Sequence, residues 1–481
     1  MSTISATGQS ATGYCRVTVV AADRRIDVAL PDDVPVADLR AHVLHLSGQT
    51  QAEGEPVGFH LLRRDGTVLD GGLSLSAQRV LDGELLALRP YADSLPPVVY
   101  DDVVDAIATA VDRDNRRWND GLMRAAGLTA GAVLLVMMGF VLWFADPVRH
   151  NMHSLPGILA GVTGVVLTAF AGVRARAYDD RASAVALGLA GLPHLLIAGS
   201  GIIAPDAGEG AGRLQFLVGC VTVLVAAVVL IALLPYGDAP FVGAALLAAA
   251  GSLGTFGVIA AGSPPRYAAA VTAVSAVALV GFLPGWSARF ARLPIGFRAQ
   301  GESADTRVDY QRIAAQARRG HELLLGLVIG CSAVVIGSVA VLGFADALWA
   351  QLLALATGVA ALLRARLFRY SAQVAALLTA GAVGLALLVL GLALNPPASA
   401  LIDMLRGDRG PIDTRTIWIG AVTAAGAALF TAIALIVPRK GLSLFWGRAL
   451  DITEGAVLLS LVPLCLAVLK VYGQVRGLGS D

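Results

Sequence analysis

Two patterns of hydrophobic and polar residues divide this chain. Between residues 14 and 90, apolar and polar residues alternate over short runs, as in half-buried β-strands, and one stretch has the apolar spacing of a helix. Beyond residue 124, long apolar runs are separated by polar connections. Because about 20 apolar residues in a helix cross the hydrocarbon core of a bilayer, these runs predict membrane spans. A small water-soluble domain therefore precedes a membrane domain.

The first pattern predicts a small α+β domain. Residues 16–20 and 26–30 alternate as two strands joined by a turn, which is typical of a hairpin. Apolar residues with helical spacing follow Pro35 and end at Gly48. Further strands are expected in GFHLLRRDG (58–66), in the short stretch TVLD (67–70) and in ELLALRP (84–90). This order of elements leaves several small α+β topologies open.

The second pattern predicts an α-helical polytopic membrane protein with about eleven transmembrane helices. The eighth candidate span is short, and the eleventh contains Asp451 and Glu454 near one end and Lys470 near the other. The candidate spans are 125–145, 155–173, 182–203, 214–235, 239–261, 267–286, 321–345, 347–363, 371–394, 416–437 and 450–472.

These patterns define the domain boundaries. Residues 1–13 are polar, lack the basic and apolar regions of a signal peptide, and are expected to be disordered. Residues 14–90 form the soluble domain and residues 91–124 a polar linker. The eleven-helix bundle occupies residues 125–476, with a long loop at residues 287–320 between the sixth and seventh spans.

Arginine placement predicts the orientation of the bundle. Connections on the N-terminal side carry clusters such as RARAYDDR (174–181), RARLFR (364–369) and PRKGLSLFWGR (438–448). Opposite connections are poorer in arginine, apart from residues 395–415, where aspartates accompany it. Since cytoplasmic loops are enriched in Lys and Arg, the N-terminal domain is expected in the cytosol and the C-terminus in the periplasm. The long cytosolic loop and its end hold the candidate interaction residues Arg289, Arg292, Arg298, Arg307, Arg312, Arg318 and Arg319.

Composition supports a membrane protein and argues against other classes. The chain is 56% hydrophobic and 15% charged with a mean hydropathy of +0.71, whereas about a quarter of a typical soluble domain is charged. A net charge of +1 argues against a nucleic-acid-binding protein, which needs a basic surface. The four cysteines are scattered without CxxC or CxxH spacing, so neither a disulfide framework nor a zinc site is expected.

The sequence contains no recognisable catalytic motif, and neither enzymatic activity nor a cofactor is expected. Lys440 and Lys470 are the only lysines and neither follows a glycine, so the chain lacks the P-loop that nucleotide hydrolysis would need. HELLL (321–325) begins like a zinc-binding helix but lacks the second histidine, and it is interpreted as a helix start near the membrane interface. His150 and His153 form a weak metal-binding pattern in a connection that is otherwise an ordinary polar loop.

Few ionisable residues lie within the predicted spans, although such residues commonly mark transport pathways. His194 in the third span is expected to hydrogen-bond a carbonyl group rather than to relay protons. Asp451 and Glu454 are expected to pair locally with Arg448 or Arg439. This scarcity argues against an ion-coupled transporter.

The N-terminal domain resembles ubiquitin-like domains, which have a β-grasp fold. The resemblance rests on SLSAQRVLDGELLALRP (74–90), which is similar to the ubiquitin segment that leads through a tight turn into the last strand. The last strand leads into Arg89-Pro90 and a linker rather than a free Gly-Gly terminus, so the resemblance implies an adaptor surface and not a conjugated modifier.

Together with the span count, two further segments carry a resemblance over essentially the whole chain. CRVTVVAADRRIDVALPDDVPVADLR (15–40) and LPPVVYDDVVDAIATAV (95–111) are similar to EccD, the multi-span membrane component of actinobacterial type VII (ESX) secretion systems. The resemblance implies a plasma-membrane scaffold surrounded by membrane lipid. It also implies a homodimer that assembles with EccB-, EccC- and EccE-type subunits and docks the EccC-type ATPase through the ubiquitin-like domain.

The overall similarity leans toward the iron-linked ESX system, although no motif identifies one. A secondary transporter with a regulatory β-grasp domain is the alternative, and it predicts a substrate site of broken helices and polar groups at mid-membrane. A membrane sensor that recruits a cytosolic partner is a third hypothesis.

Overall fold

The computed structural model of the chain divides into two units, Met1–Arg117 and Trp118–Asp481, which are considered separately. The structure describes residues 13–21, 25–47, 58–63, 65–90, 119–206, 210–234, 237–292, 310–440 and 443–472. The predicted disordered segment, apart from Gly13, and most of the predicted linker lie outside these residues.

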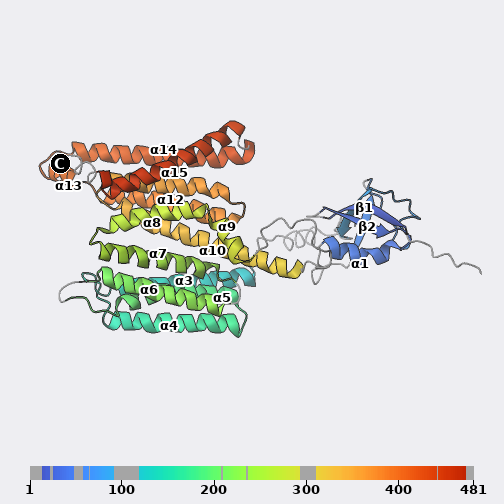
Figure 1. Cartoon of the computed structure of the whole chain (residues 1–481), viewed down its shortest axis with the longest axis horizontal. Helices are drawn as coiled ribbons and strands as arrows, with labels where there is room; N and C mark the ends of the chain where they lie inside the picture. Colours follow the sequence, from blue (N-terminus) through green and yellow to red (C-terminus); the bar gives the residue numbers. More distant parts are fainter. Residues whose placement is uncertain are drawn as a thin grey trace, which may run out of the picture. The chain divides into compact units, whose positions relative to one another are not determined.

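In its described residues, the N-terminal unit has a mixed four-stranded sheet and one helix. Its elements are β1 (Tyr14–Val20), β2 (Arg25–Pro31), α1 (Val36–Ser47), β3 (Phe59–Arg63) and β4 (Leu85–Pro90) (Figure 1). The strand order is β2-β1-β4-β3, with β1 antiparallel to β2 and parallel to β4. The predicted hairpin is confirmed. The predicted strand at 67–70 makes only an isolated bridge between Val68 and Leu62.

Alternation along the strands builds the core of this unit. Val17 and Val19 of β1 face Val36 and Val43 of α1 in one buried cluster, together with Leu86 of β4. Each fully buried Val or Leu side chain contributes about 1.5–3 kcal/mol relative to exposure, so this cluster accounts for much of the stability of a unit of this size.

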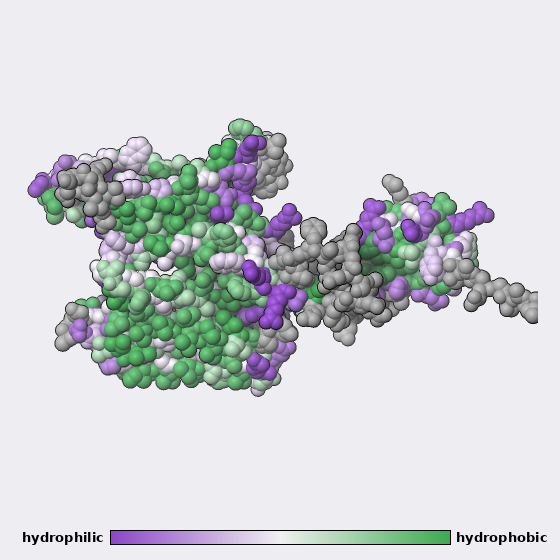
Figure 2. All heavy atoms as spheres, viewed as in Figure 1, coloured by the Kyte–Doolittle hydropathy of each residue, from purple (hydrophilic) through white to green (hydrophobic). Residues whose placement is uncertain are grey.

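The second unit is a helical bundle. Its helices are α3 (Asp120–Trp143), α4 (Leu155–Arg176), α5 (Arg181–Ser200), α6 (Arg213–Leu233), α7 (Ala239–Ala260), α8 (Pro265–Val280), α9 (Leu283–Phe290), α10 (Tyr310–Gly343), α11 (Leu348–Arg364), α12 (Ser371–Leu394), α13 (Ala398–Leu405), α14 (Gly410–Lys440) and α15 (Leu444–Val468), with a 3-10 turn at Ala365–Leu367. Most long helices run side by side (Figure 1), and the outer surface is apolar along their length with hydrophilic residues at both ends (Figure 2). Within the described residues, ten helices are long and apolar enough to cross a membrane, or eleven if α8 and α9 form one span.

The predicted sixth span, 267–286, is not one straight helix. α8 and α9 meet at an angle of 68° around Gly281 and Phe282. Pro284 lies in the first turn of α9, and proline has no backbone N–H with which to continue the hydrogen bonds of α8. The predicted loop 287–320 is also helical at both margins, because α9 extends to Phe290 and α10 begins at Tyr310.

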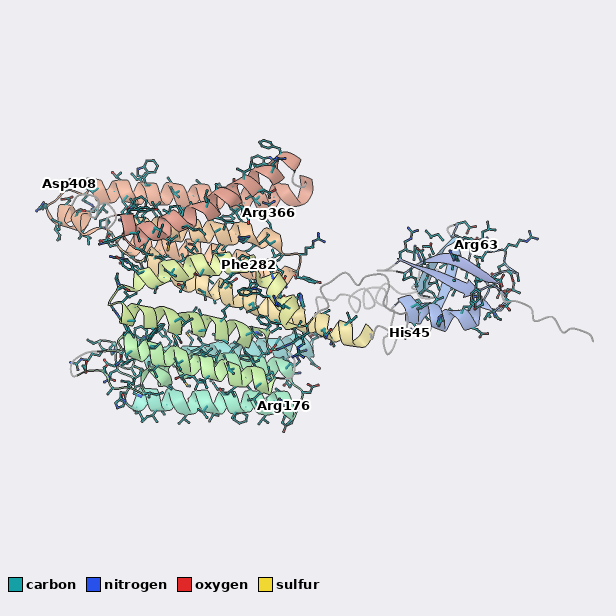
Figure 3. All side chains as sticks on the ribbon, in the orientation of Figure 1. His45, Arg63, Arg176, Phe282, Arg366 and Asp408 are labelled. Carbon is teal, nitrogen blue, oxygen red and sulfur yellow. The ribbon has the colours of Figure 1, made fainter. Side chains whose placement is uncertain are left out.

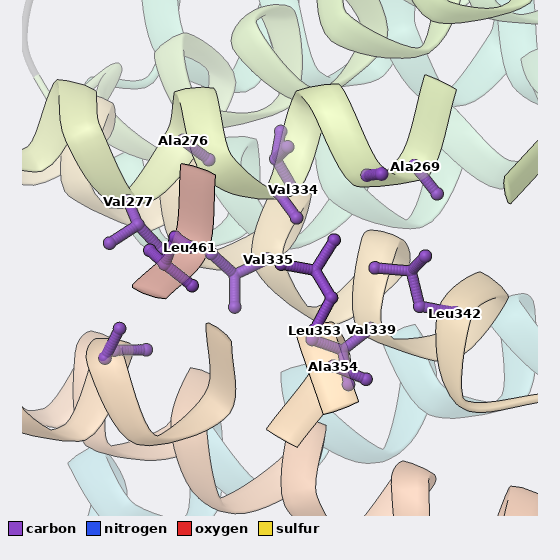
Figure 4. Close-up of a cluster of buried hydrophobic side chains, with 14 of the residues drawn as sticks. Ala269, Ala276, Val277, Val334, Val335, Val339, Leu342, Leu353, Ala354 and Leu461 are labelled. Atoms are coloured by element: carbon purple, nitrogen blue, oxygen red, sulfur yellow. The ribbon is translucent and has the colours of Figure 1, made fainter. Parts of the chain in front are cut away.

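Small side chains allow the helices to approach closely. α8, α10, α11 and α15 meet in a cluster formed mainly of alanine, valine and leucine, including Ala276, Val335, Leu353 and Leu461 (Figure 4). At the contact between α7 and α10, a Cβ atom on Gly326 would lie only 2.6 Å from the carbonyl oxygen of Ala239. In a bilayer, this close packing replaces the hydrophobic driving force that water supplies to soluble cores.

Candidate interaction surface at the basic end of the bundle

Arginine residues concentrate at one end of the bundle, hereafter the basic end. Figure 3 places Arg176, the last residue of α4, and Arg366, which follows α11, at this end, whereas Asp408 lies at the opposite end. α3, α5, α7, α10 and α12 begin at the basic end, and α6 and α14 end there. The antiparallel helix order therefore gathers the arginine clusters of distant connections on one surface.

Two carboxylates, Asp238 and Glu322, join α5, α7 and α10 at the basic end. Asp238, directly before α7, has a side chain only 1% exposed, and its Oδ1 lies 2.6 Å from Nη1 of Arg319 on α10. Glu322, one turn further along α10, lies 3.3 Å from the guanidinium of Arg181 at the start of α5. A buried carboxylate is stable only when it is paired, so the Asp238–Arg319 contact fixes α10 against α7.

A second carboxylate joins α3, α4 and α5. Asp180 caps the N-terminus of α5 by accepting a hydrogen bond from the backbone N–H of Ser183, and it pairs with Arg174 and with Arg124. Hydrogen bonds from Ser183, followed by the contacts with Arg174 and Arg124, hold the pKa of Asp180 well below its ordinary value. Asp180 is therefore ionised at neutral pH and retains both arginines.

The last helix is joined to α11 by ion pairs whose partners differ from those predicted. Glu454 lies 3.6 Å from Arg364, and Asp451 lies 2.9 Å from Arg366. The expected local pair with Arg448 is wrong, because the antiparallel packing of α11 and α15 brings the RARLFR connection beside both carboxylates. The side chain of Arg439, the other expected partner, lies outside the described part of the chain.

The predicted interaction arginines fall into three groups. Arg289, Arg292 and Arg318 are exposed, and the structure describes no ion pair for them. Arg319 is instead half-buried against Asp238 and has a structural role. Arg298, Arg307 and the side chain of Arg312 lie outside the described part of the chain.

Sequence reasoning missed the carboxylates Asp238 and Asp180. Each directly precedes an apolar helix, which is a usual capping position, and this signal could have marked them. The partner of Asp238 lies 81 residues away, however, so no local pattern could have revealed the pair.

The other candidate residues hydrogen-bond backbone carbonyl groups. Nδ1 of His194, which is fully buried, lies 3.0 Å from the carbonyl oxygen of Ala190, as expected. Nδ1 of His150 lies 2.9 Å from the carbonyl oxygen of Trp143, and Nδ1 of His153 lies 2.8 Å from that of Gly201. Among the described residues, no group of three or more His, Cys, Asp or Glu is placed to hold a metal ion. The two loop histidines therefore fasten the connection between α3 and α4.

Comparison with known proteins identifies the family. The EccD-like transmembrane domain matches residues 123–478, and YukD of the WXG100 protein secretion system matches residues 14–88. The chain belongs to the EccD family. ESX-4 secretion system protein eccD4 of Mycobacterium tuberculosis (strain ATCC 25618 / H37Rv) is 26% identical in an alignment that covers 97% of this chain and 98% of that protein.

Chains from two solved ESX complexes share this fold. Protomer 1 of the ESX-3 core complex has a TM-score of 0.59 at 19% identity, covering 96% of this chain and all of that one. The MycP5-free ESX-5 inner membrane complex in State II has a TM-score of 0.50 at 20% identity, covering 86% of this chain and 99% of that one. The predicted EccD resemblance, the polytopic helical bundle and the ubiquitin-like β-grasp domain are therefore confirmed.

Proposed function

We propose that this EccD-family chain is a non-catalytic scaffold subunit of a type VII (ESX) secretion complex in the inner membrane. One observation carries the proposal: a ubiquitin-like domain precedes a bundle whose arginines concentrate at one end (Figure 3). Among these arginines, the exposed Arg289, Arg292 and Arg318 have no described ion pair. The surface that these three arginines form at the basic end is suited to acidic patches of partner proteins. The alternative, a secondary transporter, has less support. The part of the chain that would carry the substrate site is the bundle, and the bundle matches the EccD-like transmembrane domain.

The basic end faces the cytosol in this proposal. Arg174, Arg176, Arg364 and Arg366 all lie there, and cytoplasmic loops are enriched in such residues. α3 begins at the same end, so the ubiquitin-like domain that precedes it is cytosolic. α15 runs from the basic end to the opposite end (Figure 1), which supports a periplasmic C-terminus.

The proposed partners are a second copy of the chain and EccB-, EccC- and EccE-type subunits. α14 supports the dimer, because its apolar segment leaves no residue buried within the single chain and its described packing is against α12 and α13. The ubiquitin-like domain would dock the EccC-type ATPase. Assignment to the iron-linked ESX system stays a prediction, since a relative that covers the chain is named for ESX-4.

Mild purification from native membranes tests the proposal. We expect the full chain to co-purify with an EccC-type ATPase, and deletion of residues 1–95 to abolish that association while the bundle still inserts. A solitary chain that takes up labelled solute in vesicles would instead support the transporter. Unchanged ATPase recovery after the deletion would refute the docking role of the ubiquitin-like domain.

A further inference from the structure

Two apolar cavities flank the beginning of α6, toward the end of the bundle opposite the basic end. The first has a volume of about 500 Å³ and lies among α6, α7, α8 and α10. It is lined by Phe216, Leu247, Val258, Ala268, Val334 and Val341, among others. The second has a volume of about 560 Å³ and lies among α3, α5 and α6. Ala211, Gly212 and Phe216 line both, so the two cavities adjoin at one short segment of chain.

Both cavities open to the outside of the bundle and have apolar walls. In Figure 2 the apolar surface is hollowed between the positions that α7 and α8 occupy in Figure 1. Thr272 and Ser338, two of the polar side chains of the first cavity, lie 3.0 Å apart and hydrogen-bond each other. These hydroxyl groups are therefore satisfied without a ligand, and the cavities suit hydrocarbon.

Positive charge lies at the rim of the first cavity. Arg213, the first residue of α6, lines the cavity, is exposed, and has no ion pair that the structure describes. Arg266 follows the lining residue Pro265 at the start of α8. The described lining residues of the two cavities include no Asp or Glu. A negatively charged group would therefore be stabilised at this rim.

We infer that these two cavities bind one anionic diacyl phospholipid, with one acyl chain on each side of Phe216 and the phosphate against Arg213. Two adjoining apolar cavities of similar volume match two acyl chains joined at one headgroup. Each cavity is within the size range of small-ligand sites, whereas a helix about 10–12 Å wide needs a larger groove. A zwitterionic headgroup would bring a second cation toward Arg213 and Arg266, so an anionic lipid is preferred. This inference does not depend on the proposed secretion function.

The lipid that the protein retains after extraction shows whether it prefers anionic to zwitterionic phospholipid. The full chain is reconstituted in nanodiscs that contain equal amounts of phosphatidylglycerol and phosphatidylcholine, extracted gently, and analysed for bound lipid by native mass spectrometry. We expect the bound lipid to be enriched in phosphatidylglycerol and Arg213→Gln to lower that enrichment about fivefold. This factor corresponds to the roughly 1 kcal/mol that one arginine gains near anionic lipid. Arg409→Gln, an exposed arginine at the same end but outside both cavities, is the matched control.

A steric variant tests the acyl-chain positions separately. Gly337 lines the first cavity, and a Cβ atom there would meet nothing within 4 Å, so Gly337→Leu fills the cavity without disturbing the backbone. We expect it to reduce the amount of retained lipid, whereas Gly455→Leu on α15, which is equally unobstructed, leaves it unchanged. Retention in the proportions of the nanodisc, or equal effects of each variant and its control, would overturn the inference. So would cross-linking of Gly337→Cys to a partner subunit's helix in native membranes.

Discussion

Arg319 of α10 and Asp238, which directly precedes α7, form an ion pair of 2.6 Å whose carboxylate is 1% exposed and whose guanidinium is 40% exposed. The arginine thus reaches from the surface of the basic end to a carboxylate that water does not reach. Arg318, its neighbour, is exposed and has no described ion pair. Two adjacent arginines in the predicted interaction loop therefore differ in role, one holding two helices together and the other leaving its charge available to a partner.

Loss of Arg319 is expected to destabilise the bundle. Arg319→Gln leaves the carboxylate of Asp238 buried without its cation, which costs about 2–3 kcal/mol. The double variant Asp238→Asn/Arg319→Gln is expected to recover part of this loss, because the uncompensated charge is gone. Unfolding in detergent micelles measures both, with Arg318→Gln as the control that stays within about 0.5 kcal/mol of the parent chain. Equal effects of Arg318→Gln and Arg319→Gln would contradict the structural role.

The two ion pairs of α15 are expected to differ in strength. Arg364 and Glu454 are only 18% and 16% exposed, whereas Asp451, the partner of Arg366, is 69% exposed. Since exposed pairs contribute little, Arg366→Gln should leave thermal stability almost unchanged. Arg364→Gln should lower it clearly, and the exchange Arg364→Glu/Glu454→Arg should restore part of the loss. Indistinguishable melting curves for Arg364→Gln and Arg366→Gln would refute this ranking.

Sequence patterns predicted the elements of this chain better than the contacts between them. Alternation in 16–20 and 26–30 determined the hairpin, and uninterrupted apolar runs located the spans, because both signals are local. The break between α8 and α9 was also signalled locally, by Gly281 and Pro284, but the apolar run across it concealed the bend. The partners of Asp238 and Glu454 depend on which helices adjoin, and that is decided by packing across the bundle.

Stability of the N-terminal domain is expected to fall below neutral pH because of His60. Burial, and secondly the positive charge of Arg40, lower the pKa of His60 from its ordinary 6.5. Between the folded and unfolded pKa values the unfolded state binds more protons, so stability decreases as pH falls through about 6.5 and levels off below the folded pKa. Urea unfolding of a fragment of residues 1–95 from pH 8 to pH 5 measures this. His60→Gln should reduce the dependence of the unfolding free energy on pH, whereas substitution of the exposed His45 by Gln should not. If His60→Gln leaves this pH dependence unchanged, His60 is not its source.

The apolar surface of α14, which is exposed in the single chain, is expected to form the proposed dimer contact. Val422 on α14 is 65% exposed, and Leu159 on α4 is 47% exposed. A Val422→Cys variant treated with a short thiol cross-linker in native membranes should yield a dimer of the chain, and Leu159→Cys should yield much less. The natural cysteines are mostly buried and should give little background. If both variants cross-link to the same extent, α14 has no special role in association.

The exposed arginines at the basic end are expected to bind partner subunits without supporting the fold. Replacing Arg289, Arg292 and Arg318 together by glutamate reverses the charge of the surface that they form at the basic end, so acidic partner patches should be repelled. We expect severalfold lower recovery of the EccC-type ATPase on purification, with the melting temperature of the bundle unchanged because these side chains make no described ion pair. The matched control reverses Arg406 and Arg409, exposed arginines at the opposite end, and should preserve recovery. Loss of recovery in both variants would indicate a general effect of net charge, and normal recovery in the first would place the partner contact elsewhere on the chain.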